Sequence, residues 1–356
     1  MKATASCHFP YLNEWKQYCD KNKILAFTDA VLSGYAQLAF NDNTFSGILM
    51  IIATWIGSPV VCISALWGTI IATLSATLLG APKEQIRAGI YGANAALSGL
   101  AVQPLLFPGQ SLSFMLLGVS GTIAIMTVLL IQLLSKYFAK WNLPSLVVPY
   151  CICLIFFLGL FTILGITNPT PVTFETLLFT TSLSKWSAAD LLIAFLNCAA
   201  EILWLVNPLS GILYLIALTF ASRLDTINTL VAITISLLVP TVLGLPKDAV
   251  ISGLYGYNAI LLMQVLTRGF LINKKSYLLN VCAVAITPII CCIYQLILPR
   301  IGIGSFLALP YLTVVYVIFA NRKRLRGFTY VPAKHWGVPE TISFQCTNIA
   351  SNCDPK

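Results

Sequence analysis

The sequence of 356 residues is 58% hydrophobic and 9% charged, and its mean hydropathy is +0.86. Soluble globular domains carry about 25% charged residues, so this composition excludes an ordinary water-soluble protein. The formal net charge of +9 raises nucleic acid as a partner, but no basic groove with interleaved aromatic residues accompanies it, and we expect no nucleic acid partner.

Continuous apolar runs of about 17 residues or more, the length that crosses a bilayer as a helix, recur along the chain. Only helices or closed barrels satisfy the backbone in lipid, and these runs do not alternate with period two. The sequence therefore predicts an all-α, polytopic membrane protein.

The first half of the chain begins with a cytoplasmic segment at 1–24, which lacks the apolar stretch of a cleaved secretory signal. The first membrane repeat, 25–165, opens with a short apolar segment at 26–40 that polar residues interrupt, which favours a re-entrant half-helix over a full span. Five spans are predicted after it, near 44–57, 59–80, 85–102, 112–134 and 146–165.

The second half follows an extramembrane linker at 166–189, which is rich in Thr, Ser and Pro. The second membrane repeat, 190–320, opens with a half-helix at 190–204 and is followed by a polar cytoplasmic tail at 321–356. Its five predicted spans lie near 208–221, 226–243, 249–266, 277–298 and 303–320.

These halves are copies of one unit. APKEQIRAGIYGANAAL (81–97) returns as LPKDAVISGLYGYNAIL (245–261), and QLAFNDNTFSGIL (37–49) aligns with EILWLVNPLSGIL (201–213) at the same offset of 164 (246 minus 82). One ungapped offset over two separate patches indicates a duplication. Because each unit has an odd number of spans, the second must enter the membrane upside down, which predicts two inverted repeats.

The basic residues predict the orientation, since cytoplasmic loops collect Lys and Arg. With the N-terminus inside, only Lys185, Lys247 and Arg300 of the 21 Lys and Arg fall outside. Arg268 is assigned to a cytoplasmic loop. We expect both termini in the cytoplasm, in a plasma membrane or a bacterial inner membrane.

Cysteine and histidine give no sign of a metal site or a cofactor. The 11 cysteines lie mostly in apolar segments without paired CxxC spacing, so we interpret them as small core residues. His8 and His335 both lie in polar ends. We expect no cofactor, no metal ligand and no catalytic residue.

Transport proteins with inverted repeats place their site where the half-helices meet, near the bilayer midplane. Gln37 and Phe40 of the first half-helix align there with Glu201 and Trp204 of the second. A carboxylate at the bilayer centre costs about 2.5–3.5 kcal/mol, so Glu201 is expected to face a cavity or a partner. The alternative is that it only caps or pins the broken helix.

The other repeated motif, GxYGxN, is expected to be mainly structural. Gly92 and Gly256 allow close backbone approach, and Asn94 and Asn258 can bond freed backbone where a helix is broken. Its remaining positions form one helical face that could line an apolar constriction: Ala93, Leu97, Tyr257 and Leu261.

The combination of Gln37-x-x-Phe40-x-x-Asn43 with SGIL and GxYGxNAxL, repeated from Glu201 to GLYGYNAIL, resembles the urea transporter family over about 26–320. The resemblance implies a channel-like fold of two inverted halves, each with five spans and a pore helix, assembled as a homotrimer with one pore per subunit. Urea would pass in single file between aromatic and leucine walls, beside a ladder of oxygen acceptors.

The resemblance also implies roles for single residues. Gln37 and Glu201 would mark the ends of the acceptor ladder, beside the backbone carbonyls of Leu38 and Ile202. The walls of the slot would be Phe40, Trp204, Tyr257, Leu97 and Leu261.

Three positions depart from the family pattern: Ala93 replaces an aromatic wall, and Val147 and Ala308 stand at the pore threonines. One site is therefore expected to be wider. Each missing hydroxyl leaves an amide donor unpaired at a cost of about 1–3 kcal/mol, which would slow urea or favour a smaller or less polar solute.

The sequence thus predicts a facilitative channel for urea or a small uncharged amide. An alternative is a proton-coupled or ion-coupled carrier that uses Glu201 as the titrating group. A membrane-embedded enzyme is less favoured, because the core lacks the convergent acids, histidines or metal ligands that such sites need.

Overall fold

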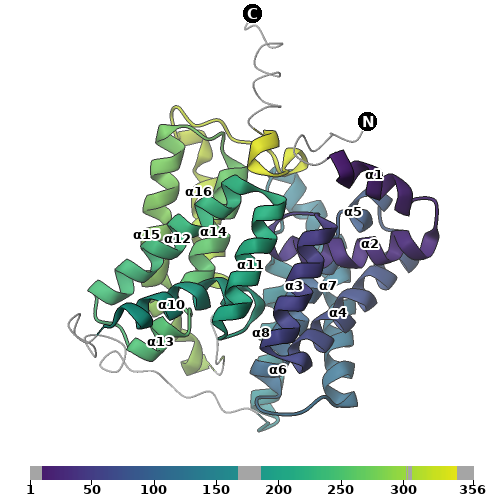
Figure 1. Cartoon of the computed structure of the whole chain (residues 1–356), viewed down its shortest axis with the longest axis horizontal. Coiled ribbons are helices and arrows are strands. Elements are labelled where there is room, and N and C mark those ends of the chain that lie inside the picture. Colours follow the sequence, from purple (N-terminus) through teal and green to yellow (C-terminus); the bar gives the residue numbers. More distant parts are fainter. Residues whose placement is uncertain (1–9, 167–185, 302, 304–306, 343–356) are drawn as a thin grey trace, which may run out of the picture.

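The computed structural model describes residues 10–166, 186–301, 303 and 307–342. Over these residues the chain is helical, apart from an isolated bridge between Phe270 and Tyr330. Figure 1 shows the first half, in purple and blue, beside the second half, in green and yellow, with α3 and α11 in contact between them. A continuous apolar core contains residues of both halves, among them Leu97 and Leu261.

The first half, residues 10–166, begins with a short helix, α1 (Pro10–Cys19). A series of helices of very different lengths comes after it. They are α2 (Lys23–Ala36), η1 (Gln37–Ala39), α3 (Thr44–Gly57), α4 (Pro59–Leu78), α5 (Lys83–Arg87), α6 (Ile90–Leu106), α7 (Phe114–Lys140) and α8 (Val148–Ile163).

The second half, residues 186–320, repeats this series. Its helices are α10 (Ala188–Ala200), η3 (Glu201–Leu203), α11 (Pro208–Ala221), α12 (Arg223–Val242), α13 (Lys247–Ile251), α14 (Gly256–Gly269), α15 (Lys274–Ile297), η4 (Leu298–Ile301) and α16 (Leu309–Ala320). The bounds of α11, α12 and α13 are those of α3, α4 and α5 moved by 164 positions, so the duplication in sequence is a duplication of elements.

The spans predicted near 85–102 and 249–266 do not begin as continuous helices. Each is broken into a short and a long helix, with Gly89 (φ 73°) and Gly253 (φ 88°) near the break. A Cβ on Gly89 would lie 2.3 Å from the nitrogen of Gly34, and one on Gly253 would lie 2.5 Å from the carbonyl oxygen of Asn197. The glycine at each break lets the backbone there pack directly against the backbone of α2 in the first half and of α10 in the second.

Both half-helices end in the same unusual turn. After η1 and η3, Phe40 (φ 51°) and Trp204 (φ 58°) adopt the left-handed conformation, which costs a bulky residue about 1–2 kcal/mol. Beyond the turns, Asn43 and Asn207 accept hydrogen bonds from the first backbone N–H groups of α3 and α11. The chain therefore reverses direction at two equivalent aromatic residues, whose conformation the surroundings must hold.

The two halves meet through matching contacts between α3 and α11. The Ser46 hydroxyl donates to the Ala217 carbonyl (2.8 Å), and the Ser210 hydroxyl donates to the Ala53 carbonyl (2.7 Å). Both donors and both acceptors are related by the offset of 164, so each half gives the other the same bond that it receives.

The helices carry the features of a membrane protein. Within the described residues, four are long and apolar enough to span a bilayer: Pro59–Leu78, Phe114–Lys140, Arg223–Val242 and Lys274–Ile301. The pair Ala188–Leu203 and Pro208–Ala221 passes the same test together and is bent by 69°. The chain is an integral membrane protein.

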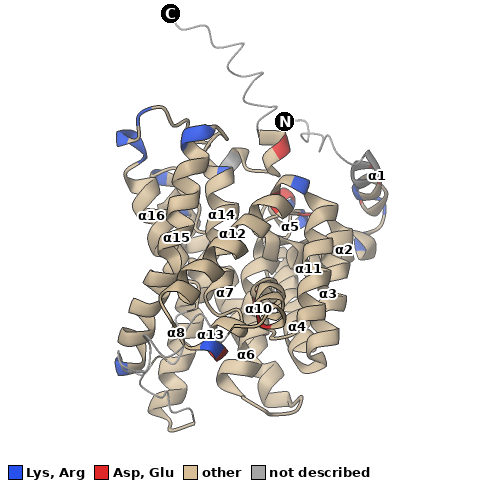
Figure 2. Ribbon diagram, turned by 60° about the vertical axis from the view of Figure 1, so that its left-hand side comes forward, with Lys and Arg blue, Asp and Glu red and all other residues tan. Residues whose placement is uncertain are grey.

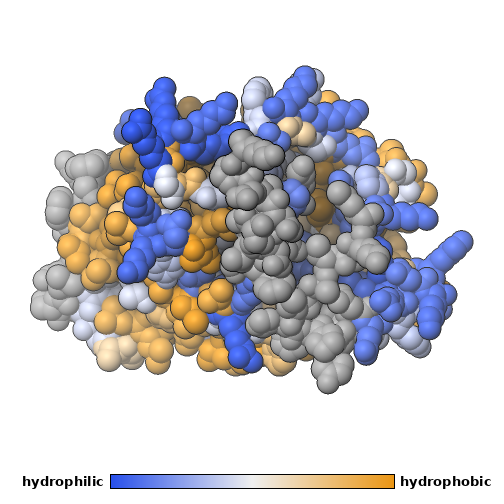
Figure 3. Space-filling model, turned by 90° about the horizontal axis from the view of Figure 1, so that it is seen from above, coloured by the Kyte–Doolittle hydropathy of each residue, from blue (hydrophilic) through white to orange (hydrophobic). Residues whose placement is uncertain are grey.

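Charge is concentrated at one end of the helices. Figure 2 shows most Lys and Arg at the upper end, with few below near α13. Seen from above, this end shows blue hydrophilic side chains on both the left and the right of the molecule, with orange apolar side chains among them (Figure 3).

Candidate functional site

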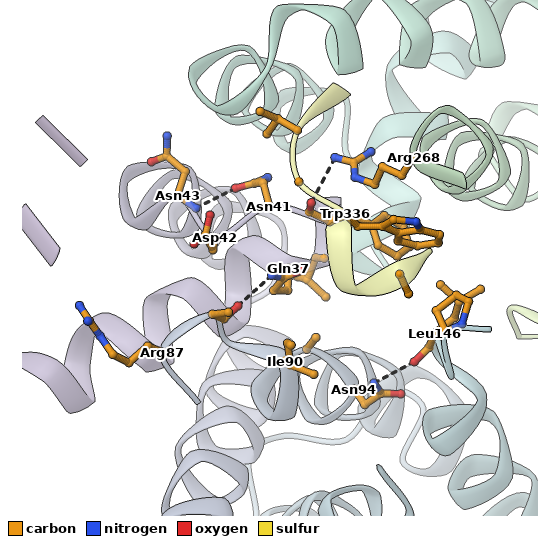
Figure 4. Close-up of a pocket in the computed structure, with 18 of the residues that line it drawn as sticks. Gln37, Asn41, Asp42, Asn43, Arg87, Ile90, Asn94, Leu146, Arg268 and Trp336 are labelled. Carbon is orange, nitrogen blue, oxygen red and sulfur yellow. Dashed lines mark hydrogen bonds between the residues drawn. The ribbon is translucent and has the colours of Figure 1, made fainter. Parts of the chain in front are cut away.

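A cavity of about 850 Å³ opens between the two halves. Figure 4 shows Gln37, Asn94, Leu146, Arg268 and Trp336 around it, contributed by several elements. Of the predicted pore residues, it is lined by Gln37, Leu38, Phe40, Ala93, Leu97 and Val147 of the first half and by Leu261 of the second.

The other predicted residues lie outside this cavity, on the second-half side of the same apolar core. The rings of Trp204 and Tyr257 are 6.4 Å apart between centroids and tilted by 42°. Ile202, Tyr257 and Ala308 are buried, and Glu201 and Trp204 are half-buried. We call Gln37, Phe40 and Ala93 the first-half site, and Glu201, Trp204 and Tyr257 the second-half site.

The two polar residues of the half-helices are held differently. The Gln37 amide nitrogen donates to the Ala88 carbonyl at 2.8 Å, which leaves the amide oxygen as its acceptor. The Glu201 carboxylate accepts no hydrogen bond from any residue that the structure describes. A carboxylate that caps or pins a helix would need such a donor.

Ala93 and Tyr257 make the two sites unequal. The Tyr257 hydroxyl donates to the Leu307 carbonyl, and the ring fills the space beside Trp204. Ala93, at the equivalent position, has neither ring nor hydroxyl, and the cavity reaches it there. The first-half site is therefore open where the second-half site is filled.

Asn94 and Asn258 hold the same backbone feature in each half, but it is the turn before α8 or α16 and not the helix break that was expected from the sequence. The Asn94 amide donates to Leu146 O (3.2 Å) and accepts from Tyr150 N (3.1 Å). Figure 4 shows the bond to Leu146. The equivalent Asn258 bonds, to Leu307 O and from Tyr311 N, are both 3.2 Å.

Those bonds fix two further left-handed residues, Leu146 (φ 47°) and Leu307 (φ 48°). Val147 and Ala308 follow them directly, each as the residue preceding a helix, with nearly equal dihedral angles. The positions that lack hydroxyl groups are therefore structurally equivalent.

Arg268 is a cavity residue that sequence reasoning missed. It was assigned to a cytoplasmic loop, but it lies on α14, and its side chain is 1% exposed. Both of its terminal nitrogens bond the buried carboxylate of Asp225, at 2.9 and 2.6 Å. A signal was present, because the first copy has Pro104 and Val61 at these two positions, so an ion pair replaces two apolar residues.

The C-terminal strap, residues 321–342, also lines the cavity. Trp336, Gly337, Val338 and Thr341 contribute to its wall. The Glu340 carboxylate accepts from the Ser222 hydroxyl at 2.8 Å and from Leu224 N at 3.0 Å, which anchors the strap at the start of α12. The sequence predicted only a polar tail here.

Within the described ranges no group of three or more His, Cys, Asp and Glu could hold a metal ion. The cavity combines amide and carbonyl oxygens with aromatic and aliphatic walls, and its lining also includes charged side chains, namely Lys16, Asp20, Asp42, Lys83, Glu84, Arg87 and Arg268. Such a site can replace the water around a small, flat, donor-rich solute, because acceptors meet its N–H groups and apolar walls meet its faces.

Comparison with known proteins identifies the family. The model of the urea transporter family matches residues 28–323. Urea transporter 1 of Ovis aries and that of Capra hircus are each 28% identical over 246 residues, which cover 68% of this chain and 63% of the relative. Urea transporter 1 of Rattus norvegicus is 27% identical over 249 residues, with the same coverage. The match thus spans less than two thirds of these relatives, but the family match covers most of this chain. The chain belongs to the urea transporter family.

Proposed function

We propose that the protein carries urea, or a small uncharged amide like it, across the membrane down its gradient through a channel-type pore. The observation that carries this proposal is a cavity lined by Gln37, Phe40, Leu97 and Leu261, which joins residues of both halves. Family membership and the names of the relatives support urea as the solute.

The pore belongs to a fold of two inverted repeats, each with five spans and one re-entrant helix. The equal bounds of α3 and α11, and of α4 and α12, support the repeat. The exchanged serine bonds between α3 and α11 support a two-fold relation between the halves. Because a unit of five spans reverses its orientation when it is repeated, the halves enter from opposite sides.

Both termini lie in the cytoplasm of a plasma membrane or a bacterial inner membrane, and the working unit is a homotrimer. The crowding of Lys and Arg at the end of the molecule where the chain begins and the strap lies supports this orientation (Figure 2). The trimer follows from the family resemblance alone.

Selection of the solute follows from the chemistry of the walls. Urea offers four N–H donors and two flat faces, which suit the acceptors of Gln37 and Glu201 and the rings of Phe40 and Trp204. An ion would lose its hydration shell without replacement. The absence of hydroxyl groups at Val147 and Ala308 shifts preference toward amides less polar than urea, and the open space at Ala93 leaves room there for amides bulkier than urea.

A second candidate is a proton-coupled carrier, favoured by the unpartnered Glu201 carboxylate in the described structure. Uptake that depends on an imposed pH gradient in the natural protein, and loses that dependence in Glu201→Gln, would establish it. Uptake that is indifferent to the gradient in both proteins supports the channel.

The deciding experiment measures solute entry into proteoliposomes by stopped-flow light scattering. Urea, methylurea, formamide and acetamide are compared with protein-free liposomes of the same lipid. We expect accelerated entry of at least one amide without any ion gradient. Entry of all four at the protein-free rate would contradict the proposal.

A further inference from the structure

We propose that Arg268 is a positioning residue that holds Phe40 in place and thereby sets the solute selectivity of the first-half site. This inference rests on the proposed transport of small amides. It concerns a residue of α14 that reaches across from the second half to the first.

Arg268 is itself firmly held. Its Nη1 bonds Asp225 Oδ1 at 2.9 Å and the Gln264 carbonyl at 2.9 Å, and its Nη2 bonds Asp225 Oδ2 at 2.6 Å. The side chains of Arg268 and Asp225 are 1% and 0% exposed. A bidentate pair of this kind fixes the plane of the guanidinium group as well as its position.

The fixed guanidinium group contacts Phe40 in two ways. Nη2 donates to the Phe40 carbonyl at 3.1 Å, and Cζ lies 5.7 Å from the centre of the Phe40 ring. The first contact holds the backbone of a residue in an unfavourable left-handed conformation, and the second holds its ring. One side chain thus determines where this wall of the cavity stands.

The comparison with the second half explains why an arginine is needed. Trp204 has the same left-handed backbone, and its ring packs beside that of Tyr257. Phe40 has Ala93 at the equivalent position, so that aromatic support is missing. Conversely, Pro104 stands at the first-copy position of Arg268, and it has no donor to offer. The ring of Tyr257 therefore lies beside the Trp204 wall and Arg268 beside the Phe40 wall, and both are supplied by α14 of the second half.

The test uses the double variant Asp225→Val with Arg268→Met, reconstituted as the full chain. Replacing both members of a buried ion pair by apolar residues avoids leaving an unpaired charge, and Val is the residue of the first copy at Val61. The measured quantity is the ratio of methylurea permeability to urea permeability. This ratio does not depend on how much folded protein is incorporated.

We expect the ratio to rise about fivefold, because a wall that is no longer held admits the methyl group; the loss of one hydrogen bond of about 1 kcal/mol corresponds to that factor. The milder Arg268→Lys, which keeps the charge but loses the planar fork, should shift the ratio in the same direction by less.

A mutant cycle separates positioning from a general structural role. In a Phe40→Ala background the double variant should change the ratio no further, whereas in the matched Trp204→Ala background its effect should persist. An unchanged ratio in both arginine variants, or an undiminished effect in the Phe40→Ala background, would overturn the inference. Failure of the proposed function is distinct, since then the natural protein would transport no amide.

Discussion

The first-half and second-half sites have the same backbone conformation and differ in the side chains that fill the space beside it. Phe40 and Trp204 end their half-helices in the same left-handed turn, and Asn94 and Asn258 make the same pair of bonds. Beside Phe40 lies a cavity of about 850 Å³, whereas beside Trp204 lies the ring of Tyr257. The two halves place these residues at equivalent positions, and the difference between Ala93 and Tyr257 leaves the first-half site open and the second-half site filled.

The two halves also differ in the buried residues that lie farther from the sites. In the second half the Gln264 amide donates to the Thr229 hydroxyl at 3.2 Å within a buried polar cluster. The first copy has Leu100 and Ala65 at these positions. At these two positions the second half therefore has a buried polar pair where the first half has apolar residues.

The largest effect on stability should come from removing the asparagine hydrogen bonds that both halves make. Asn94→Ala and Asn258→Ala should each lower the free energy of unfolding by about 1–3 kcal/mol, because each leaves a buried backbone N–H, that of Tyr150 or of Tyr311, without its acceptor. Chemical unfolding in detergent micelles measures this. The exposed Thr122→Ala on α7 is the control, with an expected change below about 0.5 kcal/mol. A large difference between the two asparagine variants would contradict the structural equivalence.

Glu201→Ala should lower urea permeability at least about tenfold, because one end of the acceptor ladder is lost. Glu201→Gln should stay within about threefold of the natural protein, since Gln37 fills the equivalent position and an amide oxygen also accepts. Stopped-flow uptake at matched protein content measures both. Equal losses in the two variants would show that the charge, rather than an acceptor, is required.

Ala93→Tyr tests directly whether the missing ring makes the first-half site wide. The added phenol should fill the cavity beside Phe40 and reduce methylurea permeability about fivefold, with a smaller reduction for urea. Tyr257→Phe is the matched control, because it keeps a ring in the second-half site. A parallel fall for both solutes in Ala93→Tyr would point to obstruction without selectivity.

Val147→Thr and Ala308→Thr should each raise the ratio of urea to acetamide permeability about threefold, because a hydroxyl supplies an acceptor to a donor that is otherwise unpaired. Competition uptake with both labelled solutes gives the ratio. Val147→Ala, which adds no acceptor, should leave it unchanged. An equal shift in Val147→Ala would attribute the effect to size.

The smallest effect should follow from loosening the C-terminal strap. Trp336→Ala removes a half-buried ring from the wall of the first-half cavity and should raise urea permeability about twofold. Trp55→Ala, at an exposed position on α3, is the matched control. Reduced permeability in Trp336→Ala alone would mean that the strap supports the pore instead of narrowing it.

Local signals in the sequence were enough to predict the helical class and the duplicated order of elements from α3 to α5 and from α11 to α13. The bounds of α3 and α11 follow from capping Asn43 and Asn207 and from the turn residues that end each helix. A structural role for Asn94 and Asn258 was also predicted, but their partners are the turns before α8 and α16 and not the helix breaks at Gly89 and Gly253.

Three features were decided only by the tertiary structure. The breaks at Gly89 and Gly253 arise because the backbone of another helix occupies the space where a Cβ would lie. Arg268 is buried because Asp225, on another helix, neutralises it there, and hydropathy alone assigned it to a loop. The strap lies against the cavity because Glu340 reaches the start of α12.

The sequence by itself thus determined which residues are equivalent in the two halves, because turns, caps and apolar length act over a few neighbouring residues. It did not determine which equivalent residues meet an open cavity and which meet a ring or an ion pair. Those outcomes depend on contacts such as that between Arg268 and Phe40, which lie far apart in the chain and come together only when the two halves pack.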